Sequence, residues 1–207
     1  MHPRLQSRAF GRPLNFSVRT PMRVVLLLVL LAVSATPQSA IADDTSANFL
    51  LRLFMNVCIP NVGQPVKVRT WAAEKHLQEV TNPIAFDIFV GPGGKGAAWA
   101  VPSAFGSFVL SVRGETEGCA TWARVANPAE VEGYFRKIVE GAARPGIDVS
   151  VVKDTRDPSP SGTIHTVVYS VSGTDKEKGG FLYTMITAER SGGPFQASLQ
   201  AARFARP

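Results

Sequence analysis

The sequence predicts an α+β domain, with a mainly antiparallel sheet and about three helices packed on one face. Three observations predict this class: amphipathic helical stretches lie early and near the middle of the chain, alternating apolar segments fill most of the rest, and the connections are short. Because strands and helices do not alternate regularly, parallel strand–helix–strand units are not expected. No linker divides residues 43–207, so we expect them to form a single domain.

The first 42 residues predict a secretory signal peptide. Met22 and Arg23 precede ten unbroken apolar residues, 24–33, and Ala40 and Ala42 provide small residues at a cleavage point. We therefore expect cleavage after Ala42 and a periplasmic or secreted protein. Ten helical residues span about 15 Å, half of a bilayer core, so no transmembrane anchor is expected after cleavage. Residues 1–21 are either an extended basic region or an over-extended start with Met22 as the true initiator.

Most of the positive charge lies in this leader. The whole chain has a formal net charge of +6, and residues 1–42 hold five arginines and no carboxylate. The rest of the chain has 17 basic and 16 acidic side chains, which leaves a net charge of +1. A nucleic-acid-binding domain keeps a clustered basic face. We therefore expect no nucleic-acid partner.

The helices are predicted from apolar periodicity and capping residues. Residues 43–46 are suited to cap a first helix that carries an apolar side over 49–58. A second helix is expected over 65–78, although the alternation at 66–69 also fits a short strand. The clearest helix, 128–142, follows an Asn-Pro cap and has a complete apolar stripe.

The strands are predicted from apolar runs and from alternation between glycine-rich turns. The first group of expected strands covers 84–90, 97–101, 107–113 and 119–125. The second group begins with alternation from residue 147 and continues over 163–172, 181–189 and 195–201. In the last of these, apolar and polar side chains alternate, which indicates one solvated face in a strand that we expect to be paired.

Cys58 and Cys119 are the only cysteines of the chain. An even number in an exported chain predicts a disulfide, and closing a loop of about 60 residues stabilises the fold by roughly 4 kcal/mol in the chain-entropy model. A free buried thiol pair and a catalytic or metal-binding site are the competing interpretations. Metal ligation is not expected, because no Cys-x-x-Cys pair occurs and only His76 and His165 follow residue 42. No cofactor is implied.

No coherent catalytic set is visible in the sequence. A serine–histidine–acid triad assembles from distant positions, so spacing alone leaves one open, but no Gly-x-Ser-x-Gly turn is present. His165 shares its strand face with Val167 and Tyr169, which indicates a partly buried structural histidine. His76 lies beside the apolar edge of the second helix, and a structural role is the simpler interpretation there as well.

These observations favour a non-enzymatic binding or interaction domain whose partner, a protein or a small molecule, is unknown. The first alternative is an envelope hydrolase that uses His165 or His76, which requires a histidine in a cleft with an acid and a hydroxyl. The second is a small-ligand carrier, which requires an enclosed apolar pocket lined by aromatic residues. Trp71, Trp99 and Trp122 are the tryptophans available for such a pocket, although aromatic residues at these spacings more often form the core.

Three short features of the chain stand out together: a cysteine that ends the first helix (Cys58), a Gly-x-Ala-Trp strand (Gly96 to Trp99) and a Gly-Cys strand start (Gly118 and Cys119). In these features the chain resembles a family of small, uncharacterised proteobacterial exported proteins with two cysteines. The resemblance spans residues 47–140. It implies export and a two-cysteine domain, and it transfers no catalytic residue to this chain.

Overall fold

The computed structural model describes residues 45–114, 118–173 and 179–204. The predicted signal peptide, its cleavage after Ala42, the choice of Met22 as initiator and the capping residues 43–44 lie outside these ranges. Contacts divide the chain into residues 1–41 and residues 42–207, and every helix and strand given below belongs to the second unit.

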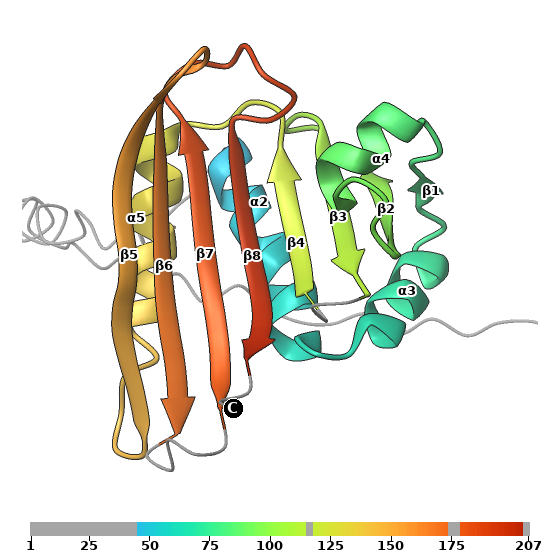
Figure 1. Ribbon diagram of the computed structural model, residues 1–207. Coiled ribbons are helices and arrows are strands. Elements are labelled where there is room, and N and C mark those ends of the chain that lie inside the picture. Colours follow the sequence, from blue (N-terminus) through green and yellow to red (C-terminus); the bar gives the residue numbers. More distant parts are fainter. Residues whose placement is uncertain (1–44, 115–117, 174–178, 205–207) are drawn as a thin grey trace, which may run out of the picture. The chain divides into compact units, whose positions relative to one another are not determined.

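Eight strands form one antiparallel sheet (Figure 1). In chain order they are β1 (Gln78–Glu79), β2 (Gly96–Val101), β3 (Phe108–Arg113), β4 (Gly118–Ala123), β5 (Ile147–Ser159), β6 (Gly162–Gly173), β7 (Gly180–Ala188) and β8 (Ala197–Phe204). The spatial order is β1-β2-β3-β4-β8-β7-β6-β5. The last strand, β8, therefore joins the two halves of the sheet by pairing with β4 and β7. The predicted fold class and the pairing of the last strand are confirmed.

The helical segments are α2 (Ser46–Leu53), η1 (Phe54–Cys58), η2 (Ile59–Asn61), α3 (Pro65–Glu74), α4 (Pro83–Val90) and α5 (Pro128–Glu140). Side chains cap α2 and α5 as their sequences predict. The Thr45 hydroxyl accepts a hydrogen bond from the Asn48 N–H, and the Asn127 side chain accepts from two N–H groups in the first turn of α5. Residues 66–69 belong to α3, so the helix forms there and the short-strand alternative does not.

Helices α2, α3 and α5 pack on one face of the sheet, here called the inner face. A single row of opposed side chains crosses six strands on this face and is buried, and its members are Trp99, Leu110, Thr121, Leu199, Met185 and Val167. Apolar residues of all three helices pack against this row, Leu50 and Phe54 from the first helical segments and Phe135 from α5 among them. Burial of this apolar surface is the main source of stability in the fold.

Residues 84–90 form a helix, and the prediction of a strand there is wrong. Asn82 caps α4 by accepting a hydrogen bond from the Ala85 N–H, and Pro83 occupies the first helical position. The helix lies on the other face of the sheet, here called the outer face, where the Phe89 ring is 5.5 Å from Trp122 and the Phe89 carbonyl accepts from the Ser111 hydroxyl. A short apolar run fits a buried helix as well as a strand, and the Asn-Pro cap was the signal that distinguished them.

The predicted disulfide between Cys58 and Cys119 is confirmed. It joins η1 to β4 on the inner face, with the two Cα atoms 5.2 Å apart and a sequence separation of 61. Both cysteines are buried. Neither one is available as a free thiol, which removes the competing interpretations of a thiol nucleophile or a thiolate metal ligand.

The solvated face predicted for the last strand is found only in part. Gln200 on the outer face of β8 is partly exposed, but Ser198 on the same face is fully buried. Gln196, just before the strand, is also buried, and its side-chain oxygen accepts a hydrogen bond from the Ala126 N–H. The turn before α5 therefore covers this end of β8.

Candidate functional site

His165 lies on the inner face of β6, under α5, and is only 3% exposed. Its strand neighbours on that face are Val167 and Tyr169, as the alternation predicts. Phe135 of α5 contacts the Tyr169 ring edge-on, with the ring centres 5.9 Å apart. This aromatic contact holds the helix over the strand. The histidine is therefore enclosed between a helix and a sheet.

Carboxylates contact both nitrogens of the His165 ring. Nδ1 is 3.1 Å from Oε2 of Glu132, in α5, and Nε2 is 2.7 Å from Oδ1 of Asp154, in the neighbouring strand β5. An ionised carboxylate accepts hydrogen bonds and donates none. Both contacts are complete hydrogen bonds only when each ring nitrogen carries a proton.

Arg136 binds the same two carboxylates from the other side. Its Nε donates to Oε1 of Glu132 over 3.0 Å, and its Nη2 donates to Oδ2 of Asp154 over 2.7 Å. Its Nη1 donates to the Tyr169 hydroxyl, which in turn donates to Glu140. These residues, His165, Glu132, Arg136, Asp154 and Tyr169, are called the His165 network below. They connect α5 to β5 and β6 through side chains alone.

The charges of the His165 network stabilise one another. Hydrogen bonds, first with His165 and then with Arg136, hold the pKa of Asp154 below its usual value. The hydrogen bond to Asp154 is the main reason that the pKa of Arg136 is raised. Burial, followed by the hydrogen bond to Glu140, raises the pKa of Tyr169. The carboxylate of Asp154 therefore stays ionised and the phenol of Tyr169 stays protonated at neutral pH.

A groove with a volume of about 460 Å³ opens beside His165, where α5 begins. Its lining comes from α5 and the residue before it, from β5 and β6, and from β7 and the residue after it; the residues are Asn127, Pro128, Ala129, Glu132, Arg156, Thr163, His165, Thr187 and Glu189. On one wall, Oε2 of Glu189 accepts a hydrogen bond from the Thr163 N–H over 3.0 Å. Hydrogen bonds from Thr163 lower the pKa of Glu189, which therefore presents an ionised carboxylate to the groove.

This groove contains a histidine, acids and hydroxyls, but their arrangement differs from that of a hydrolase. A general base needs a ring nitrogen with a free lone pair that faces the nucleophile. In His165, carboxylates contact both ring nitrogens. Among the described residues, neither nitrogen forms a hydrogen bond with the hydroxyl of Thr163 or Thr187. The predicted site residue is thus in the groove, with a carboxylate in contact with each of its ring nitrogens.

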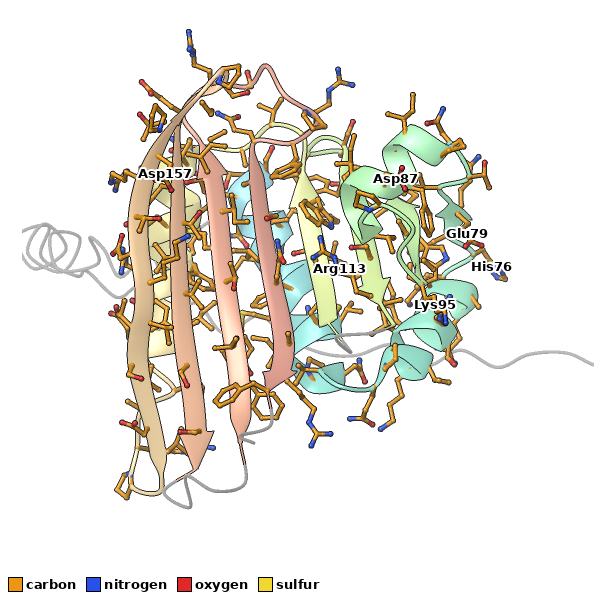
Figure 2. All side chains as sticks on the ribbon, viewed as in Figure 1. His76, Glu79, Asp87, Lys95, Arg113 and Asp157 are labelled. Atoms are coloured by element: carbon orange, nitrogen blue, oxygen red, sulfur yellow. A yellow bond between two sulfur atoms is a disulfide. The ribbon has the colours of Figure 1, made fainter. Side chains whose placement is uncertain are left out.

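His76 lies far from this groove. The backbone N–H of His76 donates to the Ala73 carbonyl, and the Leu77 N–H donates to the Ala72 carbonyl. His76 therefore ends α3 in the left-handed conformation, with a φ of 52°. The helix therefore ends at Glu74 and not near Gln78 as predicted. Figure 2 shows His76 beside Glu79 at the β1 edge of the sheet, while Asp157 marks the β5 edge. The two histidines named in the hydrolase alternative do not meet.

The tryptophans do not share a cavity. Trp99 is buried on the inner face and Trp122 on the outer face, where its indole N–H donates to the Ser111 hydroxyl over 2.9 Å. Trp71 alone lines an open apolar groove of about 320 Å³, with Phe49 and Phe105. The enclosed aromatic pocket that the carrier alternative requires is not formed by these three side chains.

Sequence reasoning found His165 but missed its partners. Glu132 and Arg136 are four residues apart on α5, a spacing that signals a helix ion pair. Asp154 gave no such signal, because the register between β5 and β6 shifts between Val151 and Lys153. Plain alternation from Val149 and Val151 would turn Lys153 toward the helix. The bulge turns Asp154 there instead.

Within residues 45–114, 118–173 and 179–204, no group of three or more histidine, cysteine, aspartate or glutamate side chains is placed to hold a metal ion. In the same part of the chain, no helix has the length and apolar character needed to cross a membrane. Comparisons with protein-family models, with curated proteins and with solved structures found no match to this chain.

Proposed function

We propose that this chain is an exported, non-enzymatic binding protein whose ligand occupies the groove beside His165. The observation that carries the proposal is the pair of carboxylate contacts to the two ring nitrogens of His165. They use the hydrogen-bonding capacity of the ring, so His165 supports the groove wall and is not free to move a proton. A pre-formed groove with a few fixed polar groups is the usual form of a small-ligand site.

The groove offers carboxylate and threonine oxygens to a ligand. The carboxylate of Glu189 is exposed and ionised, and the hydroxyls of Thr163 and Thr187 line the same space. Arg156, a cationic residue of the lining, is directed toward Glu132, with Nη2 3.6 Å from Oε2. We therefore assign the ligand class as small polar molecules that carry an ammonium or guanidinium group, which pair well with carboxylates.

An NMR titration with agmatine tests this assignment, because agmatine carries both cationic groups and no carboxylate. Agmatine is expected to shift the amide signals of Thr163, Thr187 and Glu189, whereas succinate, which carries only carboxylates, leaves them in place. Glu189→Gln is expected to weaken agmatine binding about tenfold, the effect of losing one charge-assisted hydrogen bond. Glu79→Gln, at the opposite edge of the sheet, is the matched control and leaves the affinity unchanged. Shifts confined to other regions contradict the proposed ligand class.

Export is part of the same proposal. It is supported by the leader-like composition of residues 1–42 and by the disulfide, which is typical of oxidising compartments such as the periplasm. Mass spectrometry of the protein from the host's envelope and secreted fractions tests it. The expected mass is that of residues 43–207 less two hydrogens. A mass that retains residues 1–42, or uptake of two alkyl groups without reduction, contradicts export.

A further inference from the structure

Among the described residues, strand β5 forms one edge of the sheet and pairs only with β6 (Figure 1). Most of its 13 residues are exposed, and Val151 and Val152 are among the most exposed large apolar side chains in the described part of the chain. An edge strand presents a row of backbone N–H and C=O groups that can pair with another strand. What this edge pairs with depends on which groups face outward and on the charges beside them.

Hydrogen bonds across β6 determine which backbone groups of β5 face outward. The Thr163 carbonyl accepts from the Glu189 N–H, and the Thr163 N–H donates to the Glu189 side chain, so the backbone of Thr163 faces β7. The next residue, Ile164, therefore faces β5 and pairs with Asp157. By alternation, the backbone groups of Asp154, Arg156 and Pro158 face the open edge. Proline, which has no N–H, is tolerated at such an outward position.

Residues at equal distances before and after Thr155 carry charges of opposite sign. Lys153 and Asp157 lie two residues from it, and Asp154 and Arg156 are its direct neighbours. In an antiparallel pair of two identical strands centred on Thr155, Asp154 lies opposite Arg156 of the other strand and Lys153 lies opposite Asp157. Each contact then occurs twice, because the pairing is symmetric.

We propose that the β5 edge binds a second copy of this chain, in antiparallel register with Thr155 opposite Thr155. The two eight-stranded sheets then join into one across a twofold axis. In this register, the outward backbone groups of Asp154 and Arg156 form the hydrogen-bonded pairs, as an antiparallel ladder requires. The two adjacent registers that also satisfy the backbone place Asp154 opposite Asp154 or Arg156 opposite Arg156, where like charges repel.

The side chains that this pairing needs are accessible. The side chains of Asp154 and Arg156 are 42% and 61% exposed, on the inner face. Lys153 and Asp157 are exposed on the outer face, and Figure 2 shows Asp157 at this edge. Edge strands also use charges, bulges and proline to prevent pairing. Here the bulge before Lys153 and the proline after Asp157 limit pairing to the short stretch between them, in which the charges are self-complementary.

Disulfide trapping tests the register. Thr155→Cys places two cysteines opposite each other at a non-hydrogen-bonded position, where Cα atoms are about 4.5 Å apart and a disulfide fits. Mild oxidation is expected to give a covalent dimer on a non-reducing gel. Ser150→Cys, on the same strand, is the control, because its two copies lie about 30 Å apart in this register. Equal trapping of both variants, or no trapping of Thr155→Cys, overturns the proposal.

Charge exchange tests the contacts without any new covalent bond. Lys153→Asp and Asp157→Lys each place like charges opposite one another, and each is expected to weaken dimerisation at least about tenfold in sedimentation velocity. An equimolar mixture of the two variants restores opposite charges at every contact, so it is expected to form heterodimers as strongly as the original protein forms homodimers. A mixture that stays monomeric, or an original protein that is monomeric at about 0.2 mM, overturns the proposal.

Discussion

Replacement of His165 by alanine is expected to destabilise the fold by about 3 kcal/mol. The variant loses the hydrogen bonds to Glu132 and Asp154 and leaves a space where the buried ring was. A hydrogen bond to a charged group contributes about 1.5–3 kcal/mol when it is shielded from water. The side chain of Glu132 is largely shielded, whereas Asp154 is 42% exposed, so its contact contributes less than about 1 kcal/mol.

Two features of the structure determine the size of this loss of stability. Arg136 remains bound to both carboxylates, so neither is left as an unpaired buried charge, and the loss stays below the 3–5 kcal/mol typical of a broken buried pair. The empty space left by the ring adds about 1 kcal/mol. For a chain of this size, the total corresponds to a melting temperature lower by roughly 9 °C.

Urea unfolding at pH 7, followed by circular dichroism, measures this effect. His76→Asn is the matched control, because asparagine tolerates the left-handed conformation at this exposed helix end, and it is expected to change stability by less than about 0.5 kcal/mol. A loss below about 1 kcal/mol for His165→Ala would refute the claim that the ring is bound at both nitrogens.

Three further predictions concern stability. The double variant Cys58→Ser with Cys119→Ser is expected to lose about 4 kcal/mol in urea unfolding, because the bond closes a long loop; an unchanged midpoint contradicts this. Since the pKa of Asp154 is depressed in the folded state, its stabilisation is complete above its unfolded pKa and declines as the pH falls below about 4. The stability difference between the original protein and Asp154→Asn should therefore be constant above about pH 5 and narrow in acid, and a constant difference down to pH 3 would refute it. Trp122→Phe leaves the buried Ser111 without its indole donor and should cost about 1–2 kcal/mol, whereas Trp71→Phe, at the rim of an open groove, costs less.

Much of the fold was predictable because local patterns and long-range packing agree. The Asn127 cap and the apolar stripe after it specify α5, and the alternation around Val167 specifies β6. Residues 84–90 were misassigned because their apolar run has no clear period, and only the Asn82-Pro83 cap carries the helical information.

The site was less predictable because it depends on an irregularity in the sheet. His165 follows from alternation on β6, and the spacing of Glu132 and Arg136 is visible on the helix. The face of Asp154 is set by a bulge, which inserts one residue and reverses the alternation that follows it. Bulge positions depend on the pairing of two strands, so the sequence of β5 alone does not determine them.

The protonation of the His165 ring is the most direct test of the account, because a bound cation and a catalytic base differ in one proton. A long-range ¹H–¹⁵N spectrum of the protein with ¹⁵N-labelled histidine reports each ring nitrogen separately, and His165→Gln identifies the signals. At about pH 6, the account predicts that both ring nitrogens of His165 carry protons that exchange slowly with water, because each is held in a hydrogen bond, with through-space contacts to Glu132 and Asp154. A ring with one unprotonated nitrogen under these conditions would contradict it and would support a hydrolase.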